Sequence, residues 1–83
     1  MKTIIFTPSA AKEFDHLPVE ARHAVNEALI RYVTTDQGDV KQLSGRDGHR
    51  LRVGAYRVIF NSDATTILAI YIGRRSTTTY RNH

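Results

Sequence analysis

The chain has 83 residues, of which 41% are hydrophobic and 24% charged, a composition typical of a folded globular protein and not of a disordered chain. A chain of this length is expected to form one domain over residues 1–83. It contains no cysteine, which excludes disulfides, thiolate metal sites and thiol catalysis. The longest apolar run, residues 67–72, is too short to cross a bilayer, and the N-terminus lacks the features of a signal peptide. We therefore expect a cytoplasmic protein that is not inserted in a membrane.

Charge is divided unevenly along the chain, although the formal net charge is only +4. Residues 1–40 carry four basic and six acidic side chains, a net charge of −2, whereas residues 41–83 carry eight basic and two acidic side chains, a net charge of +6. A basic half indicates a polyanionic partner, either nucleic acid or an acidic protein segment. The alternative is a basic surface that only keeps the protein in solution.

The first part of the sequence predicts one strand followed by two helices. Residues 2–6 are rich in β-branched and aromatic side chains, which favours a short strand. Thr7 is a suitable N-cap for a first helix, with Pro8 as its first residue, and this helix should end near His16. Pro18 is expected to begin a second, amphipathic helix. The apolar positions are Ala10, Phe14 and Leu17 in the first helix and Ala21, Ala24, Val25, Ala28, Leu29 and Tyr32 in the second.

The second half of the sequence changes from helical periodicity to alternation, which predicts a β-meander. Polar, glycine-containing loops are expected at residues 34–39 and 44–48, and the pattern leaves residues 40–43 as either extended or helical. The expected strands cover residues 49–53, 56–60 and 66–72. The predicted fold class is therefore α+β, with an N-terminal strand and a two-helix hairpin packed on an antiparallel β-meander.

The predicted hairpin collects arginines on one face. Gly54 and Ala55 suit a two-residue turn, because glycine accepts the positive φ at the first position of a type II′ turn. This turn pairs Arg52 with Arg57 and sends Arg50 to the same side, so one face is apolar and the other cationic. Two arginines opposite each other destabilise a sheet unless an anion neutralises them, and the guanidinium group matches phosphate or carboxylate. The alternative is that these arginines are solvated and only cover apolar surface with their stems.

Three segments of the second half closely follow a specific pattern: K-x-L-x-G, then R-L-R-x-G-x-Y-R-V-x-Y, then a strand ending in V-G-x-R with a tyrosine within several residues. In this chain they are Lys41-Gln42-Leu43-Ser44-Gly45, residues 49–60, and Ile72-Gly73-Arg74-Arg75 followed by Tyr80. With this pattern and its order of elements, the chain resembles the RelE/ParE toxin superfamily of type II toxin–antitoxin systems, and within it the RelE-like messenger-RNA interferases.

The resemblance implies a ribosome-dependent endoribonuclease that is held inactive by a cognate antitoxin in a hetero-oligomer. Its partners would be that antitoxin, the ribosome and messenger RNA. In the implied reaction the ribose 2′-OH attacks the adjacent phosphorus, leaving a 2′,3′-cyclic phosphate and a 5′-OH. Neither a metal ion nor a cofactor is needed. The site must stabilise a pentacoordinate phosphorane and transfer two protons.

By position, the resemblance assigns five residues to the catalytic site. Arg50 and Arg52 occupy the two basic positions of the first hairpin strand, and Arg57 is the phosphate-binding arginine of the next. Arg75 matches the arginine after the last strand, and Tyr80 the C-terminal tyrosine that stacks on the substrate or transfers a proton. The other basic residues expected to bind RNA or phosphate are Lys41, Arg46, Arg74 and Arg81.

The general base is the weak point of this assignment. The well-studied RelE type has lysines where this chain has Arg50 and Arg52, and arginine is effectively never deprotonated. Tyr80 is one substitute, if neighbouring arginines stabilise its phenolate. His49 and His83 are others, although the expectation is that His49 is a solvated strand-end residue and that His83 is an uninvolved terminal one.

Two further functions are compatible with the sequence. The first is a ParE-like toxin that inhibits DNA gyrase by binding, without cleaving RNA. The second is a degenerate family member that has kept antitoxin binding and lost catalysis. Tyr56 and Tyr71 are expected to be core or sheet residues under each of these hypotheses.

Overall fold

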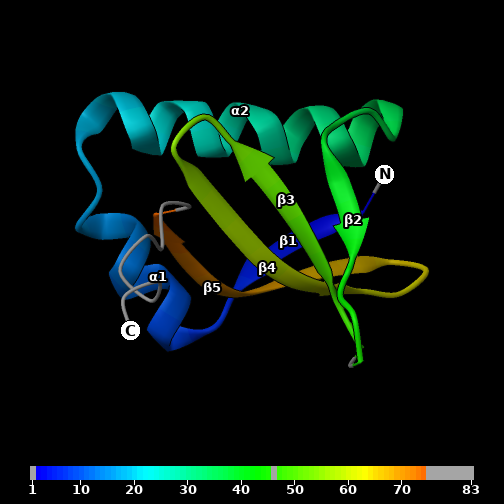
Figure 1. Ribbon diagram of the computed structural model, residues 1–83. Helices are drawn as coiled ribbons and strands as arrows, with labels where there is room; N and C mark the ends of the chain where they lie inside the picture. Colours follow the sequence, from blue (N-terminus) through cyan, green and yellow to red (C-terminus); the bar gives the residue numbers. More distant parts are fainter. Residues whose placement is uncertain (1, 46, 75–83) are drawn as a thin grey trace.

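The computed structural model describes residues 2–45 and 47–74. In chain order its elements are β1 (Thr3–Phe6), α1 (Pro8–Asp15), α2 (Val19–Thr35), β2 (Val40–Gln42), β3 (His49–Val53), β4 (Tyr56–Ser62) and β5 (Thr66–Arg74). The strands form one five-stranded sheet in the order β1-β5-β4-β3-β2, with the helices beside it (Figure 1). The predicted α+β class is confirmed.

The sheet is mixed. β3, β4 and β5 form the predicted antiparallel meander. β1 joins the sheet beside β5 and pairs with it in parallel, an arrangement that requires a long crossover and that no local pattern predicts. The segment that the sequence left as extended or helical is strand β2, which pairs with β3 at the edge of the sheet.

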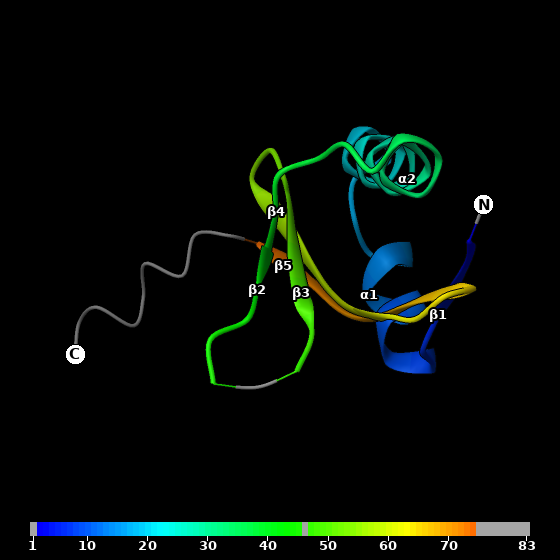
Figure 2. The same cartoon turned by 90° about the vertical axis from the view of Figure 1, so that its right-hand side faces the viewer.

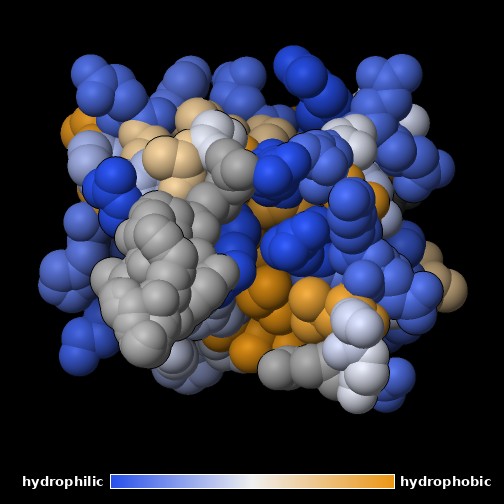
Figure 3. All heavy atoms as spheres, viewed as in Figure 1, coloured by the Kyte–Doolittle hydropathy of each residue, from blue (hydrophilic) through white to orange (hydrophobic). Residues whose placement is uncertain are grey.

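Both helices lie on one side of the sheet, as Figure 2 shows. α1 packs against β5, whereas α2 lies across β3 and β4, so the two helices cover different parts of the sheet. None of the helices in the described ranges is long and apolar enough to cross a membrane. The buried core residues are Ala10, Val25, Leu29, Leu51, Val58, Phe60, Ile67, Ala69 and Ile72. The opposite side of the sheet, here called the open face, carries no helix of the described residues and is seen in Figure 3.

The helix boundaries agree with the predictions except at Pro18 and at the end of α2. Thr34 and Thr35, predicted to lie in a loop, are helical, and their hydroxyls donate to backbone carbonyls one turn earlier. The Thr7 side chain accepts a hydrogen bond from the Ala10 N–H at 3.1 Å, which confirms the predicted cap with Pro8 as the first helical residue. The prediction that Pro18 is the first residue of α2 is wrong. Pro18 is the N-cap, because its ψ of 153° is extended, and helical geometry begins at Val19.

The predicted register of the β3–β4 hairpin is confirmed. Arg52 pairs with Arg57 and Val53 with Tyr56, and Gly54 in the turn has a φ of 57°. Because paired residues share a face, Leu51 and Val58 enter the core together.

Strand β5 contains a β-bulge that the alternation of the sequence did not predict. Ile59 pairs with Tyr71 and Phe60 with Ala69, so Ile70 is the extra residue between two successive pairs. Strict alternation would place Tyr71 on the core side with Ala69. The bulge shifts the alternation by one residue, so that Ile72 is buried and Tyr71 lies on the open face. Tyr71 is therefore a sheet residue but not a core residue.

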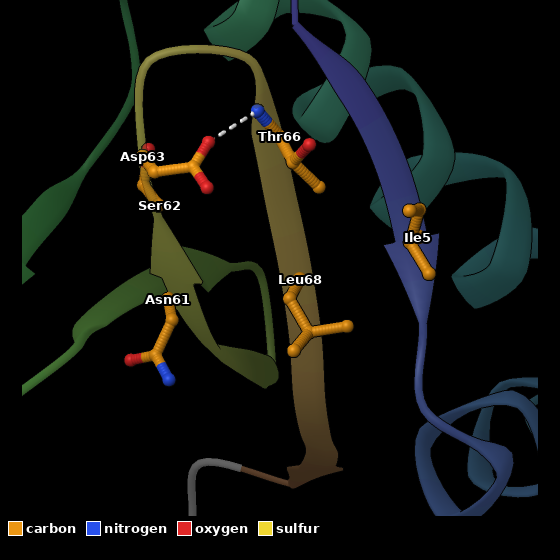
Figure 4. Close-up of a pocket in the computed structure, with 6 residues that line it drawn as sticks. All are labelled: Ile5, Asn61, Ser62, Asp63, Thr66 and Leu68. Carbon is orange, nitrogen blue, oxygen red and sulfur yellow. Dashed lines mark hydrogen bonds between the residues drawn. The ribbon is translucent and has the colours of Figure 1, made fainter.

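The turn between β4 and β5 is held by the Asp63 carboxylate. Its Oδ1 accepts hydrogen bonds from the backbone N–H groups of Thr65 and Thr66, each at 2.8 Å; Figure 4 shows the second of these. The hydrogen bonds from Thr65 and Thr66 lower the pKa of Asp63 below its ordinary value, because they favour the charged carboxylate.

Asp63→Ala should lower the free energy of unfolding at neutral pH, because the turn loses both hydrogen bonds. Since the folded-state pKa is depressed, this stabilisation is present above the unfolded-state pKa of the carboxyl and is lost as the pH falls through the folded-state pKa. Urea unfolding measured across the acid range should therefore show the difference between wild type and variant narrowing as the pH falls. Asp63→Asn is the control, because its amide oxygen keeps an acceptor without the charge. A difference that does not change with pH would contradict the contribution of the charge.

Candidate functional site

Four cationic side chains come together on the open face. Lys41 on β2 pairs with Arg50 on β3, and Arg52 on β3 pairs with Arg57 on β4. Directly paired residues project to the same side, so each pair places like charges next to each other. We call Lys41, Arg50, Arg52 and Arg57 the cationic cluster. The structure thus brings together three of the arginines predicted to be catalytic and one lysine predicted to bind phosphate.

Arg52 is partly neutralised within the protein. Its Nη1 lies 3.4 Å from Oδ2 of Asp39, and its backbone N–H donates to the Asp39 carbonyl at 3.0 Å. The protein thus supplies part of the neutralisation that the Arg52–Arg57 pair requires, in addition to any bound anion. Both side chains of this ion pair are about half exposed, so it contributes at most about 1 kcal/mol to stability.

Arg50 and Arg57 line a groove on the open face with a volume of about 430 Å³. Its other described lining residues are Leu43, Ser44, Ile59, Ile70 and Tyr71. Figure 3 shows this side of the molecule, where hydrophilic side chains lie next to an apolar patch. The groove therefore combines two guanidinium groups with an aliphatic and aromatic wall.

The guanidinium group of Arg57 is the least satisfied polar group in this groove. Its Nε is buried and has no hydrogen-bond partner among the described residues. Its Cζ lies 6.0 Å from the ring centroid of Tyr71, and within the described ranges neither Arg57 nor Arg50 forms an ion pair with a carboxylate. A buried donor without a partner costs about 1–3 kcal/mol, which a bound anion would offset. The groove has the properties of a site for phosphate attached to an apolar group.

The two arginines of the described lining are suited to electrostatic stabilisation and not to proton abstraction. The described lining contains neither a histidine nor a carboxylate. Arginine stays protonated, so Arg50 and Arg57 can stabilise a developing negative charge but cannot act as bases.

His49 is not positioned to supply the missing base. It pairs with Phe60 on the core side of the sheet, and the two rings stack with their centroids 5.4 Å apart. Its Nδ1 is buried without a partner among the described residues. His49 was expected to be a solvated strand-end residue, but it is half-buried, because the alternation of β3 turns it toward the helices.

The other predicted site residues are placed elsewhere or lie outside the described ranges. Arg74 pairs with Tyr56 on the helix side of the sheet, and its Cζ lies 5.8 Å from the Tyr56 ring centroid. It therefore lies on the other side of the sheet from the cationic cluster, and we leave it out of the candidate site. The predicted or considered site residues that lie outside the described ranges are Arg46, Arg75, Tyr80, Arg81 and His83.

The groove contains a residue that the sequence analysis did not assign to the site. Tyr71 is 40% exposed beside Arg57, although its sequence position suggested the core. The one signal in the sequence for an exposed Tyr71 is the order of residues in β5, because strict alternation would bury Tyr71 and leave Ile72 exposed. An exposed isoleucine with a buried tyrosine is the less favourable arrangement, but that preference alone does not locate a bulge.

A second cavity lies on the same face near the β4–β5 turn (Figure 4). It is lined by Ile5, Asn61, Ser62, Asp63, Thr66 and Leu68 and has a volume of about 320 Å³. The ionisable group in this lining is a carboxylate, which repels phosphate. Of the two, the arginine-lined groove is therefore the candidate anion site.

No family model and no curated protein sequence matches the chain. Several solved structures do match the chain. The isolated Escherichia coli RelE toxin superposes with a TM-score of 0.76 at 18% identity, over 96% of this chain and 93% of that one. The archaeal RelE–RelB complex from Pyrococcus horikoshii superposes with a TM-score of 0.72 at 24% identity, over 92% of this chain and 97% of that one. The chain has the RelE/ParE-type toxin fold. The YoeB dimer from Staphylococcus aureus matches with a TM-score of 0.72 at 19% identity, over 84% of this chain and 92% of that one. The RelE/ParE-type fold implied by the sequence pattern is thus confirmed.

Inorganic phosphate should stabilise this RelE-fold protein through Arg57. A ligand at a hundred-fold excess over its Kd adds about 2.7 kcal/mol to the free energy of unfolding, so thermal melts with and without phosphate report the site. Arg57→Ala should lose most of the shift in Tm, because it removes the unpaired guanidinium. Arg74→Ala is the matched control on the opposite side of the sheet and should keep the shift. Equal shifts in wild type and both variants would show that phosphate acts only as a general stabilising salt.

Proposed function

We propose that this protein is the toxin of a type II toxin–antitoxin pair and a ribosome-dependent endoribonuclease that cleaves messenger RNA. The observation that carries the proposal is the guanidinium group of Arg57, which has no carboxylate partner among the described residues and lines the same groove as Arg50. The fold supports it, because the similar structures include the toxin chains of RelB–RelE complexes.

The proposed reaction is a transesterification within the RNA chain. The ribose 2′ oxygen forms a bond to the adjacent phosphorus, and the bond between phosphorus and the 5′ oxygen breaks. The 2′-OH loses its proton, and the departing 5′ oxygen gains one. Arg50 and Arg57 bind the phosphoryl oxygens, whose negative charge rises in the phosphorane. Both arginines stand on paired strands of a sheet, so their donors need little reorganisation during the reaction.

Proton transfer is assigned outside the described lining. Because arginines cannot act as bases and His49 faces the core, a tyrosine is the candidate for this step, and the resemblance assigns it to Tyr80. Its phenolate would need neighbouring arginines for stabilisation, and Arg75 is the proposed source of that charge. No step of this scheme requires a metal ion or a cofactor.

The proposed partners follow from the charge of the cationic cluster. An antitoxin with an acidic segment would inhibit the protein by covering Arg50 and Arg57 in a hetero-oligomeric complex. The ribosome and its message supply the phosphate backbone that the groove binds in the active state. A ribosomal substrate implies a cytoplasmic location.

The test is a cell-free translation reaction in which primer extension maps the ends of the message. Wild-type protein should produce discrete cuts only when ribosomes are present. Arg57→Ala should lower the cleavage rate about a hundred-fold, the usual effect of removing one donor to a transition-state oxyanion. Arg57→Lys should retain part of the activity, because it keeps the charge without the planar fork. Arg74→Ala is the matched control and should cleave at nearly the wild-type rate.

A supercoiling assay with DNA gyrase distinguishes the alternatives. Inhibited supercoiling with an intact message would contradict the nuclease and favour a ParE-like inhibitor. A protein that binds its antitoxin but shows neither activity would be a degenerate member of the fold family.

A further inference from the structure

Tyr71 occupies an unusual position for a large aromatic residue. Its ring is 40% exposed on the open face, away from the helices that cover the core. It lines the groove together with Arg50 and Arg57, and its ring centroid lies 6.0 Å from the Arg57 guanidinium carbon. The bulge at Ile70 is what places it there. An exposed ring on this side contributes little to the hydrophobic core, so its position calls for another explanation.

Gly73 determines how the ring of Tyr71 lies. A Cβ atom at position 73 would lie 2.6 Å from Cζ and 3.0 Å from Cε2 of Tyr71, closer than real contacts allow. The ring therefore lies along the strand over Gly73, the residue that pairs with Arg57, instead of extending into solvent. Glycine at 73 leaves the space that this orientation requires. The ring thus lies next to Arg57 in a space that glycine leaves open.

The composition of the groove indicates what the ring contacts. Free phosphate would be bound by arginines alone and needs no apolar contact, yet Ile59, Ile70 and Tyr71 also line this groove. A nucleotide has both features, a charged phosphate and a flat, weakly polar base. Stacking of a base on an aromatic side chain is favourable for every base, because each has a π-face.

We propose that Tyr71 is the nucleobase-binding residue of the groove, so that its occupant is single-stranded RNA whose base stacks on Tyr71 while Arg57 and Arg50 bind the neighbouring phosphate. This inference rests on the proposed function for the identity of the nucleic acid, but it concerns binding and not cleavage. It also assigns the apolar lining a role: Ile59 and Ile70 exclude water beside the stacked base.

The experiment compares two probes by fluorescence anisotropy with the full chain. One is a 2′-O-methyl RNA oligonucleotide, which cannot be cleaved because the attacking hydroxyl is blocked. The other is an abasic strand of the same length and charge. Tyr71→Leu should weaken RNA binding about ten-fold, the size of one stacking contact, and leave binding of the abasic strand within two-fold of wild type. Tyr71→Phe should bind both probes like wild type, whereas Arg57→Ala should weaken both.

Two further variants separate stacking from a general effect on the fold. Tyr56→Leu changes the other arginine–tyrosine pair, on the helix side, and should leave RNA binding unchanged. Gly73→Ala displaces the Tyr71 ring without removing it, and should weaken RNA binding but not abasic binding. Thermal melts of every variant verify that the fold is retained.

The proposal is overturned if Tyr71→Leu binds RNA as tightly as wild type, or if it weakens RNA and abasic binding equally. It is also overturned if wild-type protein does not prefer RNA to the abasic strand. Because the RNA probe cannot be cleaved, these outcomes are independent of the nuclease. Tyr71-dependent RNA binding with an intact message in translation would contradict the proposed function and support this inference.

Discussion

The pairing register of β3 with β4 is the constraint on which the rest of the site depends. The Gly54 turn sets this register, and the register sends Leu51 and Val58 into the core while it sends Arg52 and Arg57 to the open face. Burial of each core side chain contributes about 1.5–3 kcal/mol. An opposed pair of like charges costs at most about 1 kcal/mol. The hydrophobic core therefore maintains a cationic cluster that would be unfavourable on its own.

The two faces of the sheet carry different kinds of side chain. The helix side buries the apolar residues, whereas the open face keeps the cationic cluster and the groove accessible. Within the cluster, the ion pair with Asp39 engages Arg52 and leaves Arg57 without a carboxylate partner among the described residues. This unequal neutralisation concentrates the capacity to bind an anion at Arg57 and Arg50. It also explains how the protein folds with a high density of like charge and still presents an unsatisfied guanidinium group.

A single extra residue in β5 places an aromatic ring beside the arginines of the groove. The bulge at Ile70 turns Tyr71 to the open face and returns Ile72 to the core. Beyond the bulge the same alternation carries Arg74 to the helix side, where it lies over Tyr56. The described residues thus include two arginine–tyrosine pairs on opposite faces of one sheet, and of these two the Arg57–Tyr71 pair lines the arginine groove.

The sequence by itself determined the local elements and the hairpin that carries the arginines. Thr7 and Pro8 specify a helix start, and Gly54 specifies a turn, through conformational preferences that act within a few residues. Alternation around that turn was sufficient to place Arg50, Arg52 and Arg57 on one face, because a two-residue turn leaves one register. Only the tertiary structure decided the parallel pairing of β1, the ion pair between Asp39 and Arg52, and the bulge that exposes Tyr71. Each of these depends on contacts between segments that lie apart in the chain, and no local pattern of side chains encodes such contacts.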